Sequence, residues 1–449
     1  MKLILTGLLI VFCLSPLIAQ SRKVEFNGEC RCWIDDRGKQ YSQFDSLGRY
    51  SKANFGYGQF DSSTDFDYRA RFDSEADFNS ARFNSEADFF SARFNSDTFN
   101  SDTDFQRAQF ASGAFFRGAT FDSANFRDTW FGSESYFDAA RFNSDADFRD
   151  AQFDSKADFY GAQFGSVADF GDAKFGSVAD FRRVQFDLLA DFFGTQFNSL
   201  AYFSYAQFNS DTDFINAILP DTLLFLMITT IAKEIDLTVT KLDSGKTVCF
   251  IDLTGSNIEK LKLDYGKFNL YWSRSFTSRT EKRNIYERLL RKFQLDGFLE
   301  SFELLSIEYA EFNYTEEAKA SGIPFYWHTV NWLDKNWWNY GYNKEQIFRN
   351  TGFILFLFVI INLILFRYLN NNVYKLDGIW EKYSSSNGKM GFINKFFCAL
   401  AYTGTIFFGL KFNYDKIKYH NWAAVVYFYA MYISGLVCLA YLFNFVISN

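Results

Sequence analysis

Histidine and proline are scarce in this 449-residue sequence, which contains 2 His and 3 Pro. The two histidines, His328 and His420, are too few for histidine acid–base chemistry or for a histidine-rich metal site. The G-x-S-x-G, H-E-x-x-H and P-loop motifs are missing as well. A shortage of proline is expected where backbone N–H groups are needed as donors in β-ladders. The sequence therefore predicts a β-rich protein without catalytic residues, cofactor or bound metal.

Phenylalanine, in contrast, is abundant, and between residues 55 and 214 it recurs every five or six positions. The two spacings alternate, so the repeating unit has eleven residues, and a small residue usually stands two positions before each Phe. No helix or strand has this period, whereas a fixed short period over such a length is typical of a solenoid. If each short unit is one side of a coil, about 22 residues close a four-sided turn with the phenylalanines inside. A flatter two-sided coil of about eleven residues is the alternative.

The repeated unit reads A-D-F-x-x followed by A-x-F-x-S-x, as in residues 146–156. It resembles the pentapeptide repeat family, whose motif is [Ala/Ser]-[Asp/Asn]-[Leu/Phe]-x-x. The resemblance covers residues 44–217 and implies a mainly β fold, a right-handed four-sided parallel β-helix. The regular sixth residue departs from the motif, and we interpret it as a bulged corner in every second side. We expect about eight turns over residues 44–217, with the repeat domain proper at 55–217 and a lead-in or cap at 20–54.

Outward positions of the repeats form the candidate interaction surface. The region 44–217 contains 28 acidic and 15 basic residues. Four aspartates spaced by 22 residues should stack as one acidic column: Asp147, Asp169, Asp191 and Asp213. In the last turns the extra corner residue becomes apolar, which predicts two short exposed ridges formed by Val167, Val178, Leu189 and Leu200. We expect these surfaces to contact the next domain of the chain or a second protein.

The N-terminus predicts the compartment. Residues 1–19 have one Lys, an apolar run and then Pro16 and Ala19, which is typical of a secretory signal peptide. An uncleaved membrane anchor is the alternative. Gyrase-inhibiting members of the family resemble duplex DNA, so the resemblance also implies DNA mimicry. A repeat domain exported from the cytoplasm would not meet a topoisomerase, which argues against DNA mimicry. We predict no nucleic-acid partner.

The remainder of the sequence predicts helices and a membrane. Residues 218–272 keep a looser repeat and should end the β-helix, and apolar stripes over 281–314 predict a helical hairpin. Tryptophans just before an uncharged run indicate a transmembrane domain over 327–449, with spans near 350–368, 394–411 and 421–447. The middle segment is short, so it either crosses the membrane or only enters it. Cations between the first two segments favour the cytoplasmic side for that loop, which predicts a multi-pass protein of the inner or plasma membrane with extracytoplasmic repeats.

Two functions remain open at this point. The first is a membrane-anchored scaffold, in which a rod-shaped extracytoplasmic domain binds another protein. The second is a subunit of an ion-channel-like protein, since the C-terminal order of segments is similar to pentapeptide repeat proteins that carry a two-helix, pore-loop channel domain. That resemblance implies a re-entrant loop over residues 396–412 and an oligomer. The potassium-channel filter T-V-G-Y-G is replaced by T-I-F-F-G at residues 405–409, which lacks the small residues of a carbonyl-lined path.

Overall fold

The computed structural model describes residues 22–447 except 28–31, 36–41, 45–48, 67–69, 73–75, 95–102, 274–276, 376–391, 411–414, 416 and 420. The chain divides into two units, Met1–Leu305 and Ser306–Asn449. The predicted signal peptide at residues 1–19 and parts of the predicted lead-in lie outside the described residues.

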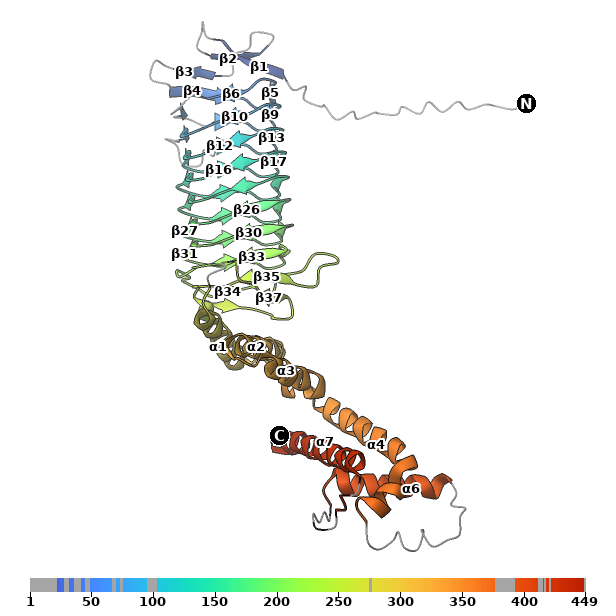
Figure 1. Cartoon of the computed structure of the whole chain (residues 1–449). Coiled ribbons are helices and arrows are strands. Elements are labelled where there is room, and N and C mark those ends of the chain that lie inside the picture. Colours follow the sequence, from blue (N-terminus) through green and yellow to red (C-terminus); the bar gives the residue numbers. More distant parts are fainter. Residues whose placement is uncertain are drawn as a thin grey trace, which may run out of the picture. The chain divides into compact units, whose positions relative to one another are not determined.

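The first unit contains a parallel β-solenoid of about nine turns (Figure 1). Each turn has four short strands, one per side, as in β20 (Ala146–Asp147), β21 (Gln152–Phe153), β22 (Ala157–Asp158) and β23 (Gln163–Phe164). The next strand, β24 (Ala168–Asp169), pairs in parallel with β20 and places Ala168 beside Ala146. Equivalent residues are therefore 22 positions apart along the chain, since 168 − 146 = 22. The four-sided prediction is confirmed, and the two-sided alternative is excluded.

The four sides are continuous ladders of strands. One side is formed by β1 (Arg22–Asn27), β5 (Gly58–Phe60), β9 (Arg82–Phe83), β13 (Gln109–Phe110), β17 (Trp130–Phe131), β21, β25 (Lys174–Phe175) and β29 (Gln196–Phe197), with β2 (Cys32–Asp35) antiparallel to β1. The next side is formed by β6 (Thr64–Asp65), β10 (Ala87–Asp88), β14 (Ala114–Phe115), β18 (Ser135–Tyr136), β22, β26 (Val178–Asp180), β30 (Leu200–Tyr202), β33 (Thr222–Leu224), β35 (Cys249–Asp252) and β37 (Phe268–Leu270).

The other two sides meet at β4 (Arg49–Asn54), which also pairs with β3 (Ser42–Phe44). One is formed by β7 (Arg71–Phe72), β11 (Arg93–Phe94), β15 (Thr120–Phe121), β19 (Arg141–Phe142), β23, β27 (Gln185–Phe186) and β31 (Gln207–Phe208). The other is formed by β8 (Ala76–Asp77), β12 (Thr103–Asp104), β16 (Ala124–Asn125), β20, β24, β28 (Ala190–Asp191) and β32 (Thr212–Asp213). A separate pair, β34 (Ile235–Asp236) and β36 (Leu261–Lys262), lies near the C-terminal end.

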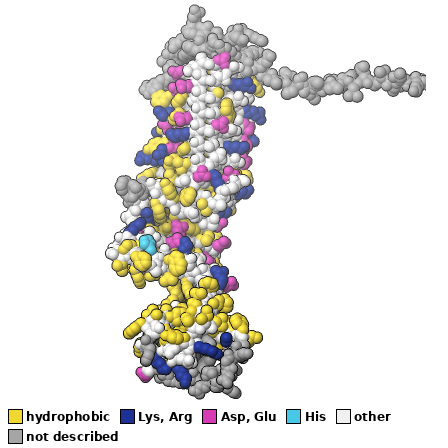
Figure 2. All heavy atoms as spheres, turned by 45° about the vertical axis from the view of Figure 1, so that its right-hand side comes forward, with side chains coloured by type: hydrophobic (Ala, Val, Ile, Leu, Met, Phe, Trp, Pro, Cys, Tyr) yellow, Lys and Arg dark blue, Asp and Glu magenta, His cyan; other side chains and the backbone are white. Residues whose placement is uncertain are grey.

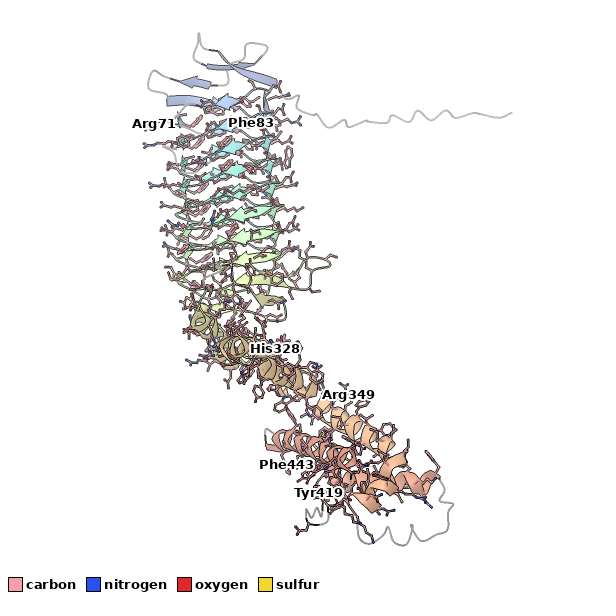
Figure 3. All side chains as sticks on the ribbon, viewed as in Figure 1. Arg71, Phe83, His328, Arg349, Tyr419 and Phe443 are labelled. Atoms are coloured by element: carbon pink, nitrogen blue, oxygen red, sulfur yellow. The ribbon has the colours of Figure 1, made fainter. Side chains whose placement is uncertain are left out.

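The solenoid interior is a set of stacked phenylalanine rings. Phe148 stacks on Phe170 of the next turn at 5.0 Å between ring centroids, and meets Phe159 of its own turn edge-on at 5.5 Å. Ala146, two residues before Phe148, is buried as well. Figure 3 marks Phe83, which is fully buried, and Arg71, which is exposed on the surface. The strands are too short to be stable alone. Burial of each aromatic side chain contributes about 1.5–3 kcal/mol to stability, and these contributions hold the turns together.

The corners explain the eleven-residue unit. After each Asp-Phe pair the chain turns in two residues, and the second of these has a positive φ, as in Asp150 at 57°. The amide of Ala151 closes this turn by donating to the carbonyl of Phe148 at 3.1 Å. The alternate corner has three residues, for example 154–156, between a Phe and the next Ala. The sixth residue of the repeat therefore lies at every second corner.

Two helices follow the solenoid, α1 (Arg279–Asp296) and α2 (Leu299–Ala320). The side chain of Ser278 accepts from the amide of Glu281 and caps the start of α1, and Gly297 ends it in the left-handed conformation. The buried face of α1 packs on the last turn, where Phe293 lies 6.1 Å from Tyr265 between ring centroids. Helix α1 therefore covers the C-terminal end of the solenoid, which would otherwise expose unpaired strand edges.

The second unit contains α3 (Pro324–Trp338), η2 (Asn339–Gly341), α4 (Lys344–Asn372), α6 (Phe392–Phe407) and α7 (Trp422–Ile447), together with the end of α2. Among the described helices, two are long and apolar enough to cross a membrane, within Glu345–Leu365 and Trp422–Phe443. The segment predicted as a span at 394–411 overlaps the 16-residue helix α6, Phe392–Phe407, which is shorter than the roughly 20 residues of a typical span.

Helix α6 is held between the two long helices. Along α6, Thr403 bonds to Asn362 and Phe407 packs on Phe358, so α6 runs antiparallel to α4. After α6 the chain returns to the end of α4, where the amide of Lys418 donates to the carbonyl of Val373 at 2.8 Å. The chain thus enters and leaves the α6 region at the same end of α4.

Candidate interaction surface

The predicted acidic column is present. Asp147, Asp169, Asp191 and Asp213 occupy equivalent positions of the neighbouring strands β20, β24, β28 and β32. All four side chains are partly buried rather than freely exposed. The column is therefore part of the wall of the solenoid as well as of its surface.

These aspartates have a structural role that the sequence reasoning missed. The Oδ1 atom of Asp169 accepts a hydrogen bond from the amide of Gly171 at 2.9 Å, and Asp191 accepts from Phe193 at 2.8 Å in the same way. The bond fixes the two-residue corner, as short polar side chains do in Asx turns. Asn125, one position earlier in the same column, accepts from Arg127 at 3.0 Å. The corner thus requires an acceptor oxygen and not a charge.

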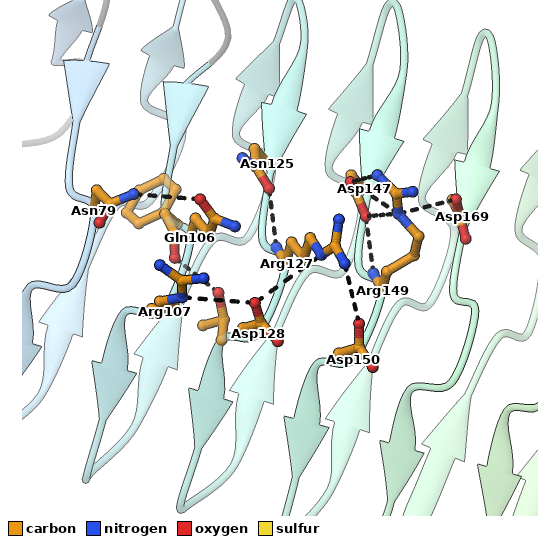
Figure 4. A network of polar contacts seen from close by, with 12 residues as sticks. Asn79, Gln106, Arg107, Asn125, Arg127, Asp128, Asp147, Arg149, Asp150 and Asp169 are labelled. Carbon is orange, nitrogen blue, oxygen red and sulfur yellow. Dashed lines mark hydrogen bonds and ion pairs between the residues drawn. The ribbon is translucent and has the colours of Figure 1, made fainter.

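Arginine side chains neutralise only part of the negative charge of the column. The guanidinium of Arg149 lies between two of the aspartates, with its Nε 3.0 Å from Oδ1 of Asp147 and 3.3 Å from Oδ2 of Asp169 (Figure 4). Among the described residues, Asp191 and Asp213 have no ion-pair partner. Burial first, and then the neighbouring carboxylates, raise the pKa of Asp169 and of Asp191 above its usual range. The C-terminal half of the column is therefore the part where negative charge is least compensated.

Replacing Asp169 by Asn should stabilise the solenoid at pH 7, because the amide oxygen keeps the corner bond while the partly buried charge is removed. Asp169→Ala should instead lower the free energy of unfolding by about 1 kcal/mol, because the corner amide loses its acceptor. Urea unfolding of the matched pair measures both effects. A neutral or destabilising Asn variant would contradict this role.

The same group makes the stability depend on pH. Because the pKa of Asp169 is raised in the folded state, the folded state binds a proton more tightly than the unfolded chain does. The contribution of Asp169 to stability should therefore rise as pH falls through the folded pKa toward the unfolded value, and be absent at neutral pH. The Asp169→Asn variant should show a smaller gain on acidification than the parent protein.

No metal site is apparent in the part of the chain that the structure describes. There, no group of three or more His, Cys, Asp or Glu side chains is arranged to hold a metal ion. The aspartates of the column are engaged by corner amides and, in part, by arginine.

The predicted apolar ridges are only partly exposed. Val178 lies beside Leu200 in β26 and β30, as the spacing predicted, but both side chains are partly buried. Val167 and Leu189, at the equivalent corners before β24 and β28, are partly buried as well. Leu188 is the exposed apolar side chain at this place. The four predicted ridge positions are thus neither buried nor fully exposed, and the ridges are less exposed than the spacing predicted.

Sequence reasoning missed a cluster of tyrosines and arginines nearby. Tyr160, Arg183 and Tyr205 are exposed, and Arg182 and Tyr202 are partly buried. Arg182 lies over the rings of Tyr160 and Tyr202, at 5.6 and 5.0 Å from their centroids. Arg183 lies over Tyr160 and Tyr205, at 5.8 and 5.7 Å. We call these five residues the aromatic–arginine cluster. The sequence could have indicated this cluster, because its members follow the 22-residue period. Residues one turn apart are 160 and 182, 180 and 202, and 183 and 205.

One arginine of the cluster is paired with a carboxylate and the other is not. Arg182 pairs with Asp180, donating from Nε to Oδ1 at 2.8 Å. Arg183 is exposed and has no ion-pair partner among the described residues. Tyrosine and arginine are the residue types most enriched where proteins bind other proteins. The cluster is therefore better suited to a contact than the aspartate column.

The second unit presents a different surface. Hydrophobic side chains cover most of its visible face, whereas the visible face of the solenoid carries mixed acidic and basic side chains (Figure 2). Large apolar side chains of α4 and α7 point outward, including Phe353, Ile364 and Phe443. An apolar exterior on helices of this length associates the unit with a membrane.

The geometry of the first unit defines its class, a four-sided parallel β-solenoid with a short repeat. Residues 131–174 match the family model described as pentapeptide repeats (9 copies), and this part of the chain is a pentapeptide repeat solenoid. Comparisons with curated proteins and with solved structures found no match.

Proposed function

We propose that this protein is a non-enzymatic, membrane-anchored scaffold whose solenoid lies outside the cytoplasm and binds another protein. The observation that supports this most is the aromatic–arginine cluster on a rigid, fully packed solenoid, carried by a chain whose other unit has an apolar exterior. A solenoid offers binding surface in proportion to its length and needs no pocket.

The proposed orientation rests on charge and on the N-terminal segment. The predicted signal peptide exports the repeats. Cations at the end of α4 and in the segment after it, including Arg367 and Lys375, favour the cytoplasmic side for that segment. In this orientation the solenoid and the start of α4 are on the outer side of the membrane.

The proposed contact is centred on Arg183. Its guanidinium is exposed between two tyrosine rings and has no carboxylate partner among the described residues. A partner with a surface carboxylate would satisfy the cation, and the flat rings would bury apolar area at little cost in side-chain entropy.

Site-specific photo-crosslinking in the native membrane tests this function. A benzoylphenylalanine at position 160 or 205 should give the same discrete adduct, because both positions border Arg183. The control position is Gln163, an exposed residue on another side of the same turn, which should not give this adduct. Arg183→Glu should abolish the adduct. No adduct, or the same adducts from position 163, would contradict a specific contact at this cluster.

A second function, a subunit of an ion-channel-like protein regulated by its repeats, is favoured by one observation. The chain enters the α6 region and leaves it at the same end of α4, as a re-entrant segment does. The carbonyls of Thr405 and Ile406, however, accept from the amides of Leu410 and Gly409 at 2.8 and 3.1 Å, so these two carbonyls are not free to line a path. Reconstituted protein should therefore give no current in planar bilayers, and a reproducible ion-selective current would favour the channel.

A further inference from the structure

Helix α3, which precedes the first long apolar helix, has its polar face turned toward the protein. Asp334 accepts hydrogen bonds from the hydroxyl of Tyr314 on α2 and from that of Tyr441 on α7, the latter at 2.9 Å. Asn331, one turn earlier, accepts from the hydroxyl of Tyr340 at 2.5 Å. The polar groups that would normally face water are thus used inside the second unit.

The opposite face of α3 is aromatic and uncovered. None of the residues of α3 is buried, Phe325 is 83% exposed and Trp332 is 63% exposed, and Tyr326 lies beside them. The exposed residues of α3 include His328 and Lys335 but no carboxylate. The exposed face of α3 thus combines large aromatic side chains with polar ones, among them Thr329 and Asn336, whereas Asp334 and Asn331 are used inside the unit.

The position of α3 identifies what covers this face. Its last residues are fixed to the start of α4, because Gln346 and Asn350 donate to the carbonyl of Asn336 at 2.6 and 2.7 Å. Its Trp338 ring packs on Tyr441 near the end of α7, at 5.1 Å between centroids. Helix α3 therefore lies where α4 begins and α7 ends. If these two helices span a membrane, this is the level of the lipid headgroups.

We propose that α3 lies in the headgroup region of the bilayer, with Phe325, Tyr326 and Trp332 in contact with lipid. Tryptophan and tyrosine prefer this zone, because one part of each side chain is apolar and another part forms hydrogen bonds. His328 suits the adjacent phosphate groups, whereas Lys335 already pairs with Glu311 of α2, Nζ to Oε1 at 2.6 Å. The lipid contact of the protein thus begins at α3, some twenty residues before the apolar run of α4. This inference rests on the proposed membrane anchoring.

Photo-crosslinking of the full-length protein in nanodiscs of phosphatidylcholine and phosphatidylglycerol tests the proposal. Benzoylphenylalanine replaces Trp332, and two controls carry it at Phe356, an exposed residue of α4, and at Tyr160 on the solenoid. Mass spectrometry then separates lipid adducts from adducts with protein. We expect lipid adducts at position 332 at least about tenfold above those at position 160 and close to those at position 356.

The two controls distinguish a failure of the α3 proposal from a failure of the proposed membrane anchoring. If position 356 gives lipid adducts but position 332 gives only the background seen at position 160, α3 is in water and the proposal is wrong. If position 332 gives dimers or adducts with the solenoid of the same chain, protein covers the aromatic face and the proposal is equally wrong. If position 356 also fails to give lipid adducts, the membrane anchoring itself is overturned.

Discussion

Replacing Phe159 by Ala should lower the free energy of unfolding of the solenoid by about 3–5 kcal/mol. The ring of Phe159 is fully buried and stacks between Phe137 and Phe181, at 4.9 and 5.0 Å between centroids. It also meets Phe148 and Phe170 edge-on, so its removal breaks contacts within one turn and between three turns. The strand before it, β22, buries only the small side chain of Ala157, and the cavity cannot close without moving whole turns.

Phe193 supplies the matched control, since it follows a core phenylalanine but is 42% exposed at a corner. Phe193→Ala should change the free energy of unfolding by no more than about 0.5 kcal/mol. Urea unfolding followed by far-UV circular dichroism measures both variants. Equal losses for Phe159→Ala and Phe193→Ala would contradict the assignment of inner and outer positions.

Replacing Gly435 by Ala should destabilise the second unit by about 3 kcal/mol, the upper end of the usual cost of overpacking. A Cβ at this position would lie 1.6 Å from the carbonyl oxygen of Phe407 and 2.8 Å from its Cα. Because both atoms are backbone, the last turn of α6 would have to move away from α7. That movement would also strain the bond from Asn362 to Thr403, which is buried between the helices.

Gly352 on α4 is the control for this variant, because a Cβ there meets nothing within 4 Å. Gly352→Ala should be neutral or slightly stabilising, since alanine favours the helix by about 1 kcal/mol. Thermal unfolding of the full-length protein in detergent compares the two substitutions. A Gly435→Ala protein as stable as the parent would show that α6 does not pack against α7 in this way.

The 22-residue period made most of the solenoid predictable. It placed Asp147 beside Asp169 and Val178 beside Leu200, and it identified the buried phenylalanines, because a strict repeat leaves one way to stack the turns. It could not show that the aspartates hold the corners, since that role depends on the backbone angles of the two residues after each Phe. The partial burial of the extra corner residues likewise depends on how the chain folds there.

The second unit was less predictable from sequence. Composition identified the two long apolar helices, but it left open whether the short middle segment crosses the membrane or only enters it. The place of α6 depends on contacts between residues far apart in the sequence, such as Asn362 with Thr403 and Gly435 with Phe407. The aromatic–arginine cluster could have been predicted from the sequence, because the 22-residue period that aligned the aspartates also places Tyr160 beside Arg182.

Topology mapping tests the central claim, an exported solenoid held by two membrane crossings, most directly. Reporters fused at residues 300 and 380 and at the C-terminus would be assayed in intact cells. The account predicts that residue 300 and the C-terminus lie outside, because α7 returns to the level of α3, and that residue 380 is cytoplasmic. A cytoplasmic position for residue 300, or a C-terminus on the side opposite to it, would contradict the account.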